Sequence, residues 1–299
     1  MSNKSGFVTI IGRPNVGKST LLNQILGQKI AITSDKPQTT RKRIRGIHTT
    51  GQGQIVFIDT PGVHKPLYKL GEFLLDEAKV AVPDADLVLF LVDAQEPPGR
   101  GDEWIVKNLL DIKIPIIMVV NKVDRVKDLQ TREENVMAYK TLFKENIPIV
   151  KISAKTGRNV DTLIKNIYRK LPKGVNLFPD DDTTDQTVRE IAEEIIREKV
   201  LINTHDEVPH SIAVVIDKFE EKDTLNKIIA TIYVEHDSQK GIIIGKQGQM
   251  LKKIGQSARE EIEKLDEKKV FLDLQVKIQK DWRKKDKALK SFGFVQEQD

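Results

Sequence analysis

The chain has 299 residues, of which 39% are hydrophobic and 31% charged, a balance that excludes a disordered chain and fits a globular one. It contains no cysteine, which excludes disulfides and thiolate metal sites. No apolar run approaches the roughly 20 residues that span a bilayer, and the first residues lack the apolar stretch of a signal peptide. We therefore expect a cytoplasmic protein, long enough for two domains with separate cores.

The net charge of +5 is distributed unevenly. Residues 1–176 hold 28 basic and 18 acidic side chains, and residues 177–186 hold four Asp and no basic residue. Residues 187–299 hold 21 basic and 22 acidic side chains. The overall charge of the C-terminal part therefore does not indicate nucleic-acid binding, and only local basic runs can do so.

In the first half of the chain, short runs rich in Val and Ile alternate with amphipathic segments. The strands that we expect are Phe7–Ile11, Ile55–Ile58, Leu87–Val92, Ile116–Val120 and Ile149–Ile152. Helical spacing lies between them, for example at Lys18–Leu26, Asp102–Leu110 and Val160–Leu171. Runs that are apolar on both faces are typical of buried parallel strands, so these units predict an α/β fold with a doubly wound, mostly parallel sheet. Such sheets bind ligands at the carboxyl ends of their strands.

The pattern changes near residue 173. Residues 174–186 contain Gly, Pro and an acidic cluster, which predicts a linker between domains at 1–173 and 187–299. In the second domain we expect an α-β-β-α-α-β order. Its elements are Val188–Ile202, Ser211–Phe219, Lys227–Glu235, Gly241–Gly248, Gln249–Leu265 and Val270–Ile278, followed by a basic helix at Asp281–Ser291. This order predicts an α+β domain.

A phosphate-binding motif lies between the first expected strand and the first expected helix. The pattern G-x-x-x-x-G-K-[ST] is matched by Gly12, Arg13, Pro14, Asn15, Val16, Gly17, Lys18 and Ser19. Glycines let backbone N–H groups approach phosphates, and the helix N-terminus adds positive potential. We expect Lys18 to reach the β- and γ-phosphates, the Ser19 hydroxyl to bind Mg²⁺, and Thr20 to take part in phosphate binding.

A second motif distinguishes GTP from ATP. Asn121-Lys122-Val123-Asp124 follows the strand expected at Ile116–Val120. The Asp124 carboxylate can accept from both N1–H and the exocyclic amine of guanine, whereas adenine lacks this pair of donors. Asn121 and Lys122 are expected to support the loop, with the Lys122 stem over the base. After the next strand, the backbone N–H groups of Ser153, Ala154 and Lys155 are expected to close over the base. Alone, each string also fits a polar turn, but their order behind the first motif indicates GTP.

Asp59-Thr60-Pro61-Gly62 ends the strand expected at Ile55–Ile58. Asp59 is placed to hold Mg²⁺, and the Gly62 N–H to meet the γ-phosphate. That contact exists only with the triphosphate, so residues 63–71 are expected to be a mobile switch. Within Gln38-Thr39-Thr40-Arg41, Thr40 rather than Thr39 is expected to complete the Mg²⁺ shell. The basic residues around Thr40 fit either a solvated loop or a contact to RNA or phosphate; they are Lys36, Arg41, Lys42, Arg43 and Arg45.

These four elements in this order resemble the translation-factor-like GTPases. Residue 63 is Val, where many GTPases have a Gln that orients the attacking water, so slow intrinsic hydrolysis is expected. A hydrophobic residue here together with Asn15 is similar to potassium-activated GTPases. That resemblance implies that Asn15 holds K⁺ against the phosphates; the alternative is a hydrogen bond that stabilises the loop.

The second domain carries a G-x-x-G sequence, Gly245-Lys246-Gln247-Gly248, between two helical segments. In an α-β-β-α-α-β order this is the pattern of a type II KH domain, whose G-x-x-G loop clamps a single-stranded backbone. Residues 238–259 hold five basic residues and no acidic one, although a tight turn with a solvated face is the alternative. The expected RNA-binding residues are Lys240, Gly241, Ile242, Ile243, Ile244, Gly245, Lys246, Gln247, Gly248, Lys252, Arg259, Trp282 and Arg283. The isoleucines would form an apolar floor for bases, and Trp282 would stack on one.

Both halves together resemble the Era family of bacterial ribosome-assembly GTPases. The resemblance rests on the motifs above, on Glu235–Gly248 and on Lys280-Asp281-Trp282-Arg283, and it covers nearly the whole chain. It implies binding to the 3′ region of 16S rRNA, assistance in 30S subunit assembly, and a loose peripheral contact with the inner face of the cell membrane. We expect a monomer.

The leading hypothesis is a switch in which GTP and Mg²⁺ order the Thr40 and Gly62 loops and thereby control whether the second domain's groove is open to RNA. An alternative is a GTP-driven membrane- or protein-interaction module whose second domain binds protein instead of RNA. A third is an enzyme that hydrolyses nucleotide while acting on a metabolite. No second catalytic constellation in the sequence favours this last function, and the five His are scattered.

Overall fold

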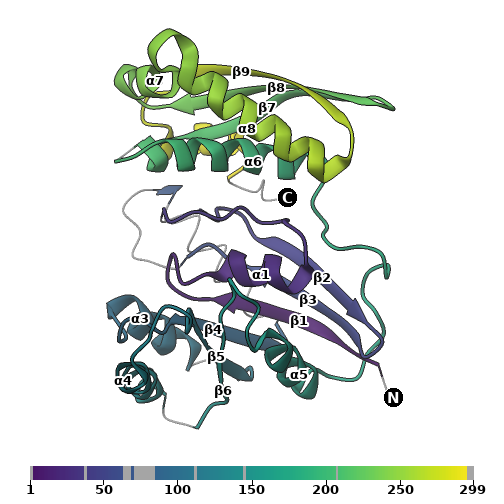
Figure 1. Cartoon of the computed structure of the whole chain (residues 1–299), viewed down its shortest axis with the longest axis vertical. Coiled ribbons are helices and arrows are strands. Elements are labelled where there is room, and N and C mark those ends of the chain that lie inside the picture. Colours follow the sequence, from purple (N-terminus) through teal and green to yellow (C-terminus); the bar gives the residue numbers. More distant parts are fainter. Residues whose placement is uncertain are drawn as a thin grey trace. The chain divides into compact units, whose positions relative to one another are not determined.

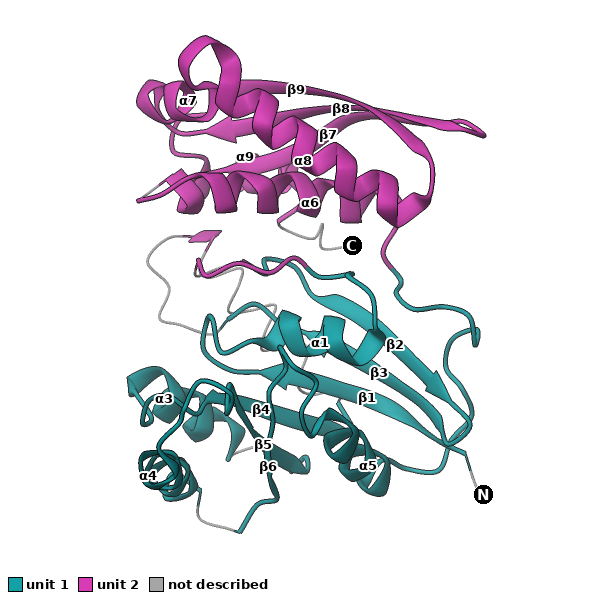
Figure 2. Cartoon of the chain, viewed as in Figure 1, with its two compact units in different colours: residues 1–31, 40–66, 74–185 teal, residues 32–39, 67–73, 186–299 magenta. Residues whose placement is uncertain are grey.

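The computed structural model describes residues 3–36, 39–62, 69–70, 85–110, 113–143, 146–206 and 208–294. The chain divides into two compact units, which Figure 2 shows in two colours. Unit 1 comprises residues 1–31, 40–66 and 74–185, and unit 2 comprises residues 32–39, 67–73 and 186–299. The domain limits expected from the sequence stay a proposal. Among the helices that the structure describes, none combines the length and the apolar character that crossing a membrane requires.

Unit 1 is built on a six-stranded sheet with the order β2-β3-β1-β4-β5-β6 (Figure 1). β2 runs antiparallel to β3, and the other neighbours are parallel. The strands are β1 (Lys4–Ile11), β2 (Ile44–Thr50), β3 (Gly53–Asp59), β4 (Leu87–Asp93), β5 (Ile116–Asn121) and β6 (Ile149–Lys151). The doubly wound α/β fold is thereby confirmed, although the sequence analysis did not find β2. Gly46 lies within that strand opposite Phe57, and a Cβ there would lie 2.6 Å from Leu22 Cδ1 of α1.

Helices cover both faces of this sheet. One hydrophobic cluster joins Leu21 of α1 (Lys18–Leu26) and Leu163 of α5 (Val160–Lys170) to the strands. A second cluster joins helices α3 (Arg100–Leu109) and α4 (Leu129–Lys140) to β1, β4 and β5. β3 and β4 are buried along their whole length, as expected for strands covered on both sides.

Unit 2 contains a three-stranded sheet, β7-β8-β9, in which β8 pairs antiparallel with β7 and parallel with β9. Its elements are α6 (Val188–Asn203), β7 (Ala213–Glu221), β8 (Leu225–Val234), α7 (Asp237–Ile244), α8 (Gln249–Asp266), β9 (Lys269–Ile278) and α9 (Asp286–Ser291), with 3-10 turns at Val208–His210, Lys246–Gly248 and Trp282–Lys284. Ile196 of α6 and Ile254 of α8 share one core with Ile228 of β8. The expected α-β-β-α-α-β order is present, and it puts the G-x-x-G sequence between α7 and α8.

Candidate nucleotide site and nucleic-acid groove

The phosphate-binding motif forms the loop between β1 and α1. Its glycines are required sterically, since a Cβ at Gly12 would lie 2.3 Å from the Leu91 carbonyl oxygen and one at Gly17, with φ 101°, would lie 2.4 Å from Asn121 Nδ2. The buried Lys18 Nζ donates to the carbonyl oxygens of Gly12 and Arg13, both at 3.1 Å. Burial lowers the pKa of Lys18 to about 8, and Asp59 opposes that shift only in part. An anion in this loop would supply the missing counter-charge.

Three oxygen-bearing side chains converge beside Lys18. The Ser19 hydroxyl donates to Asp59 Oδ2 at 2.6 Å and lies 2.9 Å from Thr40 Oγ1. The Thr39 hydroxyl instead donates to the Lys36 carbonyl oxygen at 2.6 Å. Asp59 is fully buried, which raises its pKa, and its Oδ1 has no hydrogen-bond partner among the described residues. Hard oxygen donors of this kind with an unpaired carboxylate oxygen suit Mg²⁺.

Gly62 lies directly against the phosphate-binding loop. A Cβ at this position would lie 2.7 Å from Pro14 Cα, so only glycine permits the approach. Thr60, two residues before it, donates from its hydroxyl to the Ile10 carbonyl oxygen at 2.8 Å. Residues 63–68 and 71 of the expected switch lie outside the described residues, as does Gln38. Those expectations therefore stay predictions.

The guanine motif is tied to the phosphate loop by one buried side chain. Asn121 Nδ2 donates to the Val16 carbonyl oxygen, and its Oδ1 accepts from the Ala154 N–H, both at 2.8 Å. Lys122 adopts a left-handed backbone, φ 62°, and its ammonium pairs with Asp93 Oδ2 at 2.6 Å. Asp124 is exposed, so its carboxylate is accessible to a base.

The remaining predicted residues of the nucleotide site lie around this framework. Ser153 is buried, and its Oγ accepts from the Thr156 N–H at 3.2 Å, while Lys155 is exposed. Thr20 is half-buried at the start of α1. Asn15 is exposed and adopts a left-handed backbone, φ 64°.

Two acidic residues of this region were missed by the sequence analysis. One is Asp102, whose Oδ2 pairs with Arg13 Nε at 2.7 Å. Asp102 gives no motif signal, because α3 lies far from the loop in sequence. Asp93, the partner of Lys122, could have been found, since it is the last residue of an otherwise apolar strand and lies at the sheet edge where ligands bind.

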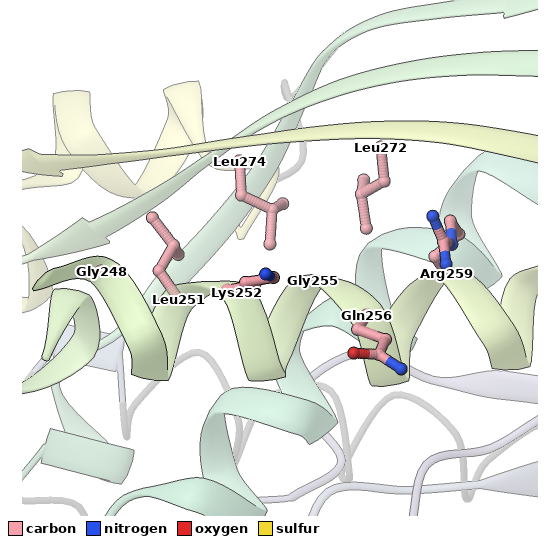
Figure 3. Close-up of a pocket in the computed structure, with 8 residues that line it drawn as sticks. All are labelled: Gly248, Leu251, Lys252, Gly255, Gln256, Arg259, Leu272 and Leu274. Atoms are coloured by element: carbon pink, nitrogen blue, oxygen red, sulfur yellow. The ribbon is translucent and has the colours of Figure 1, made fainter.

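In unit 2, a cavity of about 380 Å³ lies between α8 and β9. Figure 3 shows Leu272 and Leu274 reaching from β9 towards α8, which carries Lys252 and Arg259. The full lining is Gly248, Leu251, Lys252, Gly255, Gln256, Arg259, Leu272 and Leu274. Three of the predicted RNA-binding residues therefore line this groove. The apolar part of its lining consists of leucines, which the sequence analysis did not select.

Other predicted RNA-binding residues require correction. Trp282 is fully buried, donates from Nε1 to the Ser211 carbonyl oxygen at 2.8 Å, and stacks on Phe294 with a centroid distance of 5.7 Å. It cannot stack on a base, because the end of the chain folds over it. Ile243 is also fully buried and fills the core, so it is no floor for bases.

The remaining predicted residues around the G-x-x-G loop have mixed exposure. Arg283 Nε pairs with Glu235 at 3.0 Å. Ile242, Gly241, Lys246 and Gln247 are exposed, and Lys240 and Ile244 are half-buried. Gly245 is required as glycine, with φ 71° and a Cβ position 2.7 Å from Met250 Cβ.

Comparisons with known proteins match both parts of the chain. Residues 7–122 match the family model described as 50S ribosome-binding GTPase, and residues 207–283 match the KH domain. The chain is 53% identical over 296 residues to GTPase Era of Geobacter metallireducens, with 98% of each chain covered. It is 49% identical over 304 residues to GTPase Era of Carboxydothermus hydrogenoformans, with 99% of each chain covered.

Two solved structures are similar over nearly the whole chain. A crystal structure of an Aquifex aeolicus Era variant bound to GDP and AlF4⁻ has a TM-score of 0.94 at 41% identity, covering 98% of this chain and 100% of that one. Era in complex with MgGDPNP and nucleotides 1506–1542 of 16S ribosomal RNA has a TM-score of 0.94 at 40% identity, with the same coverage. Fold and sites thus define a P-loop GTPase followed by a KH domain. The chain belongs to the Era family, and its reaction is the hydrolysis of GTP.

Proposed function

We propose that this GTPase binds the 3′ region of 16S rRNA in the groove between α8 and β9 and acts as a GTP-controlled switch in assembly of the 30S subunit. The groove is the observation that supports this most directly. Its floor is apolar, Lys252 and Arg259 lie along it, and Gly248 forms one end. KH domains clamp four nucleotides of a single strand in this way. The similar Era structure in complex with nucleotides 1506–1542 of 16S rRNA supports the choice of RNA.

The open backbone at the end of the groove supports the same proposal. Gly248 has φ 77°, and no atom lies within 4 Å of a Cβ built there. The α8 helix begins immediately after it without a side-chain cap, so the positive end of its dipole can meet a phosphate. Bases would then rest on the leucines, while the cations would neutralise the backbone.

In unit 1, the residues proposed to bind GTP divide by role. The phosphates would contact the loop from Gly12 to Thr20 and the Gly62 N–H, and the base would contact Asn121, Lys122, Asp124, Ser153, Ala154 and Lys155. Ser19, Thr40 and Asp59 would hold Mg²⁺, which fits the unpaired Oδ1 of Asp59. When bound, the metal ion neutralises charge on the β- and γ-phosphates. The chain itself positions the nucleotide, and Lys18 adds positive charge beside the phosphates.

The switch would operate through the two loops that meet the γ-phosphate, at Thr40 and Gly62. GTP would hold both, and hydrolysis would release them. Asn15 is the proposed K⁺ ligand. A monomeric state, a cytoplasmic location and a peripheral contact with the cell membrane stay predictions from the sequence and the family resemblance.

A charge reversal with a matched control tests the RNA groove. Lys252→Glu lies in the groove, whereas Lys253→Glu changes the neighbouring exposed lysine, which does not line it. With an RNA of the 16S 3′ sequence and fluorescence anisotropy, we expect Lys252→Glu and Gly248→Asp to weaken binding at least about tenfold, and Lys253→Glu to do so less than about threefold. Equal losses from the two lysine variants would contradict the groove. Unchanged binding by Gly248→Asp would favour a protein partner. If the protein binds RNA equally tightly with a GTP analogue and with GDP, the proposed switch is contradicted.

A further inference from the structure

Arg13 belongs to the phosphate-binding loop, but its side chain is engaged on the other side, by α3 and α4. Its Nε pairs with Asp102 Oδ2 at 2.7 Å, and its Nη2 donates to Tyr139 OH at 3.3 Å. Nη2 also pairs with Glu96 at 3.1 Å, but the Glu96 side chain is 56% exposed. The guanidinium therefore has two buried partners and one solvated partner.

Asp102 is the central partner, because it is buried completely and contacts Arg13, Gly99 and Tyr139. Its Oδ2 also accepts from the Gly99 N–H at 2.9 Å and from Tyr139 OH at 3.4 Å. Its Oδ1 is buried and has no hydrogen-bond partner among the described residues. Burial raises the pKa of Asp102 despite the charge of Arg13. A buried ion pair of this kind contributes little net stability, so what it offers the protein is fixed geometry.

The backbone of Arg13 carries that geometry into the nucleotide site. Its carbonyl oxygen accepts from Lys18 Nζ at 3.1 Å. The next residue, Pro14, forms the surface against which Gly62 lies, with a Cβ at Gly62 placed 2.7 Å from Pro14 Cα. From the other side, Gly101 leaves room for the Arg13 side chain, since a Cβ there would lie 3.1 Å from Arg13 Cδ. Arg13 thus connects α3 to Lys18 and, through Pro14, to Gly62.

We propose that Asp102 is a positioning residue for GTP hydrolysis, which acts through Arg13 on the Lys18 and Pro14 side of the phosphate loop. Tyr139 supports the pair from α4. Pro14 contacts Gly62, whose N–H is assigned to the γ-phosphate alone, so a displaced Pro14 affects hydrolysis more than the binding of GDP. The proposal rests on the nucleotide-site residues assigned above and is independent of RNA binding.

The test compares the effect of each variant on kcat for GTP with its effect on the Kd for GDP, in the full-length protein. We expect Asp102→Asn to lower kcat for GTP at least about tenfold, because small displacements in such sites are costly, while the Kd for GDP changes less than about threefold. Glu96→Gln, which removes the solvated partner of the same guanidinium, is the matched control and should leave both values within about twofold. Asp102→Glu should recover part of the lost kcat. A kcat of Asp102→Asn within about twofold of the parent would overturn the proposal, and so would a parallel loss of kcat and GDP affinity.

A double-mutant cycle tests whether Asp102 acts through Arg13. The kcat of Arg13→Gln with Asp102→Asn should be no lower than that of Arg13→Gln alone, whereas independent contributions would multiply and contradict the pathway. If Asp102→Asn does not fold, Tyr139→Phe replaces it; a kcat at least about threefold lower with GDP affinity kept supports the role, and an unchanged kcat overturns it. Lys18→Ala is measured alongside. Normal GDP binding by that variant would reject the site assignment itself, whereas lost binding there with normal kcat in Asp102→Asn would reject only the positioning role.

Discussion

The side-chain amide of Asn121 donates to the carbonyl oxygen of Val16 at 2.8 Å, and so joins the guanine loop to the phosphate loop. Its oxygen accepts from the N–H of Ala154 at 2.8 Å, which adds the third loop. Asn121 is 2% exposed, and Gly17 leaves the space that its amide occupies. One buried amide therefore holds the three loops together, and the proposed nucleotide site predicts that its effect on binding is independent of the number of phosphates.

Asn121→Ala is therefore expected to weaken the binding of GDP and of GTP to a similar extent. It leaves the Val16 carbonyl oxygen and the Ala154 N–H buried without partners, and each unpaired group costs about 1–3 kcal/mol. We expect both Kd values to rise at least about tenfold in a fluorescent-nucleotide titration. Asn166→Ala, at a surface position whose amide donates to the Thr162 carbonyl oxygen of the same helix, is the control. A loss of GTP affinity alone would contradict the loop-joining role.

Asp124→Asn tests the choice of base. The exposed carboxylate can accept two N–H donors of guanine, and an amide can accept only one of them while its NH₂ meets the other. Xanthine carries a carbonyl oxygen in place of the exocyclic amine, so the amide suits it. We expect GTP affinity to fall at least about a hundredfold and xanthosine triphosphate to bind better than it does to the parent chain. Unchanged discrimination would place base recognition elsewhere.

Gly62→Ala is expected to affect hydrolysis selectively. The added methyl would lie 2.7 Å from Pro14 Cα and 2.8 Å from Pro14 N, both backbone atoms that cannot turn aside. The Gly62 loop must therefore move away from the site of the γ-phosphate. We expect kcat to fall at least about tenfold and GDP affinity to change little. Gly51→Ala serves as control, since no atom lies within 4 Å of a Cβ there. Equal losses in GDP and GTP binding would show a general distortion instead.

The nucleotide loops and the α-β-β-α-α-β order of the second domain were predictable from the sequence. The loops depend on the backbone geometry of short, continuous segments. Gly12 and Gly17 allow approaches that no other residue permits, and these requirements remain visible in the sequence. The Asp102–Arg13 pair was not predictable, since it joins segments about ninety residues apart and neither residue forms a pattern. The leucines of the groove were missed for a similar reason, because Leu251 and Leu272 line one cavity only after β9 has packed beside α8.

Trp282 shows why exposure was the least predictable property. A tryptophan among the seven basic residues of 277–290 suggests a stacking surface. However, Phe292 and Phe294 pack on its ring, at centroid distances of 5.4 and 5.7 Å. Its burial depends on these residues, which follow in a segment with little sequence pattern of its own.

The burial of Trp282 leads to a prediction on stability. Trp282→Ala should destabilise unit 2 by about 3–5 kcal/mol, as other large-to-small core substitutions do, and the Ser211 carbonyl oxygen would lose its N–H donor. Chemical denaturation followed by circular dichroism measures this. Trp282→Phe keeps a ring in the core and should retain RNA affinity within about twofold. A large loss of RNA affinity in a fully folded Trp282→Phe protein would instead restore the stacking role.

Asn15, which is exposed in the phosphate loop, leads to a prediction on potassium dependence. If this residue holds K⁺ against the phosphates, the ion supplies charge that an arginine finger supplies elsewhere, where it is worth about 10³–10⁵ in rate. We expect hydrolysis at least about tenfold faster in KCl than in NaCl of equal ionic strength. Asn15→Ala should remove most of this difference while GDP affinity is kept. Equal rates in the two salts would eliminate the cation and leave a loop-stabilising role for Asn15.

His48 gives unit 1 a defined dependence on pH. It lies on β2 and lines a cavity of about 730 Å³ with Gln24 and Tyr168, and burial lowers its pKa below the ordinary value of about 6.5. Between the lowered pKa and 6.5, the unfolded chain binds a proton that the folded chain does not. His48 therefore takes nothing from the unfolding free energy above about pH 6.5, and it lowers that free energy as the pH drops through that window. Denaturation of the parent and of His48→Gln between about pH 7.5 and 5 should show a smaller loss in the variant. Parallel curves for the two proteins would mean that His48 is protonated equally in the folded and unfolded states.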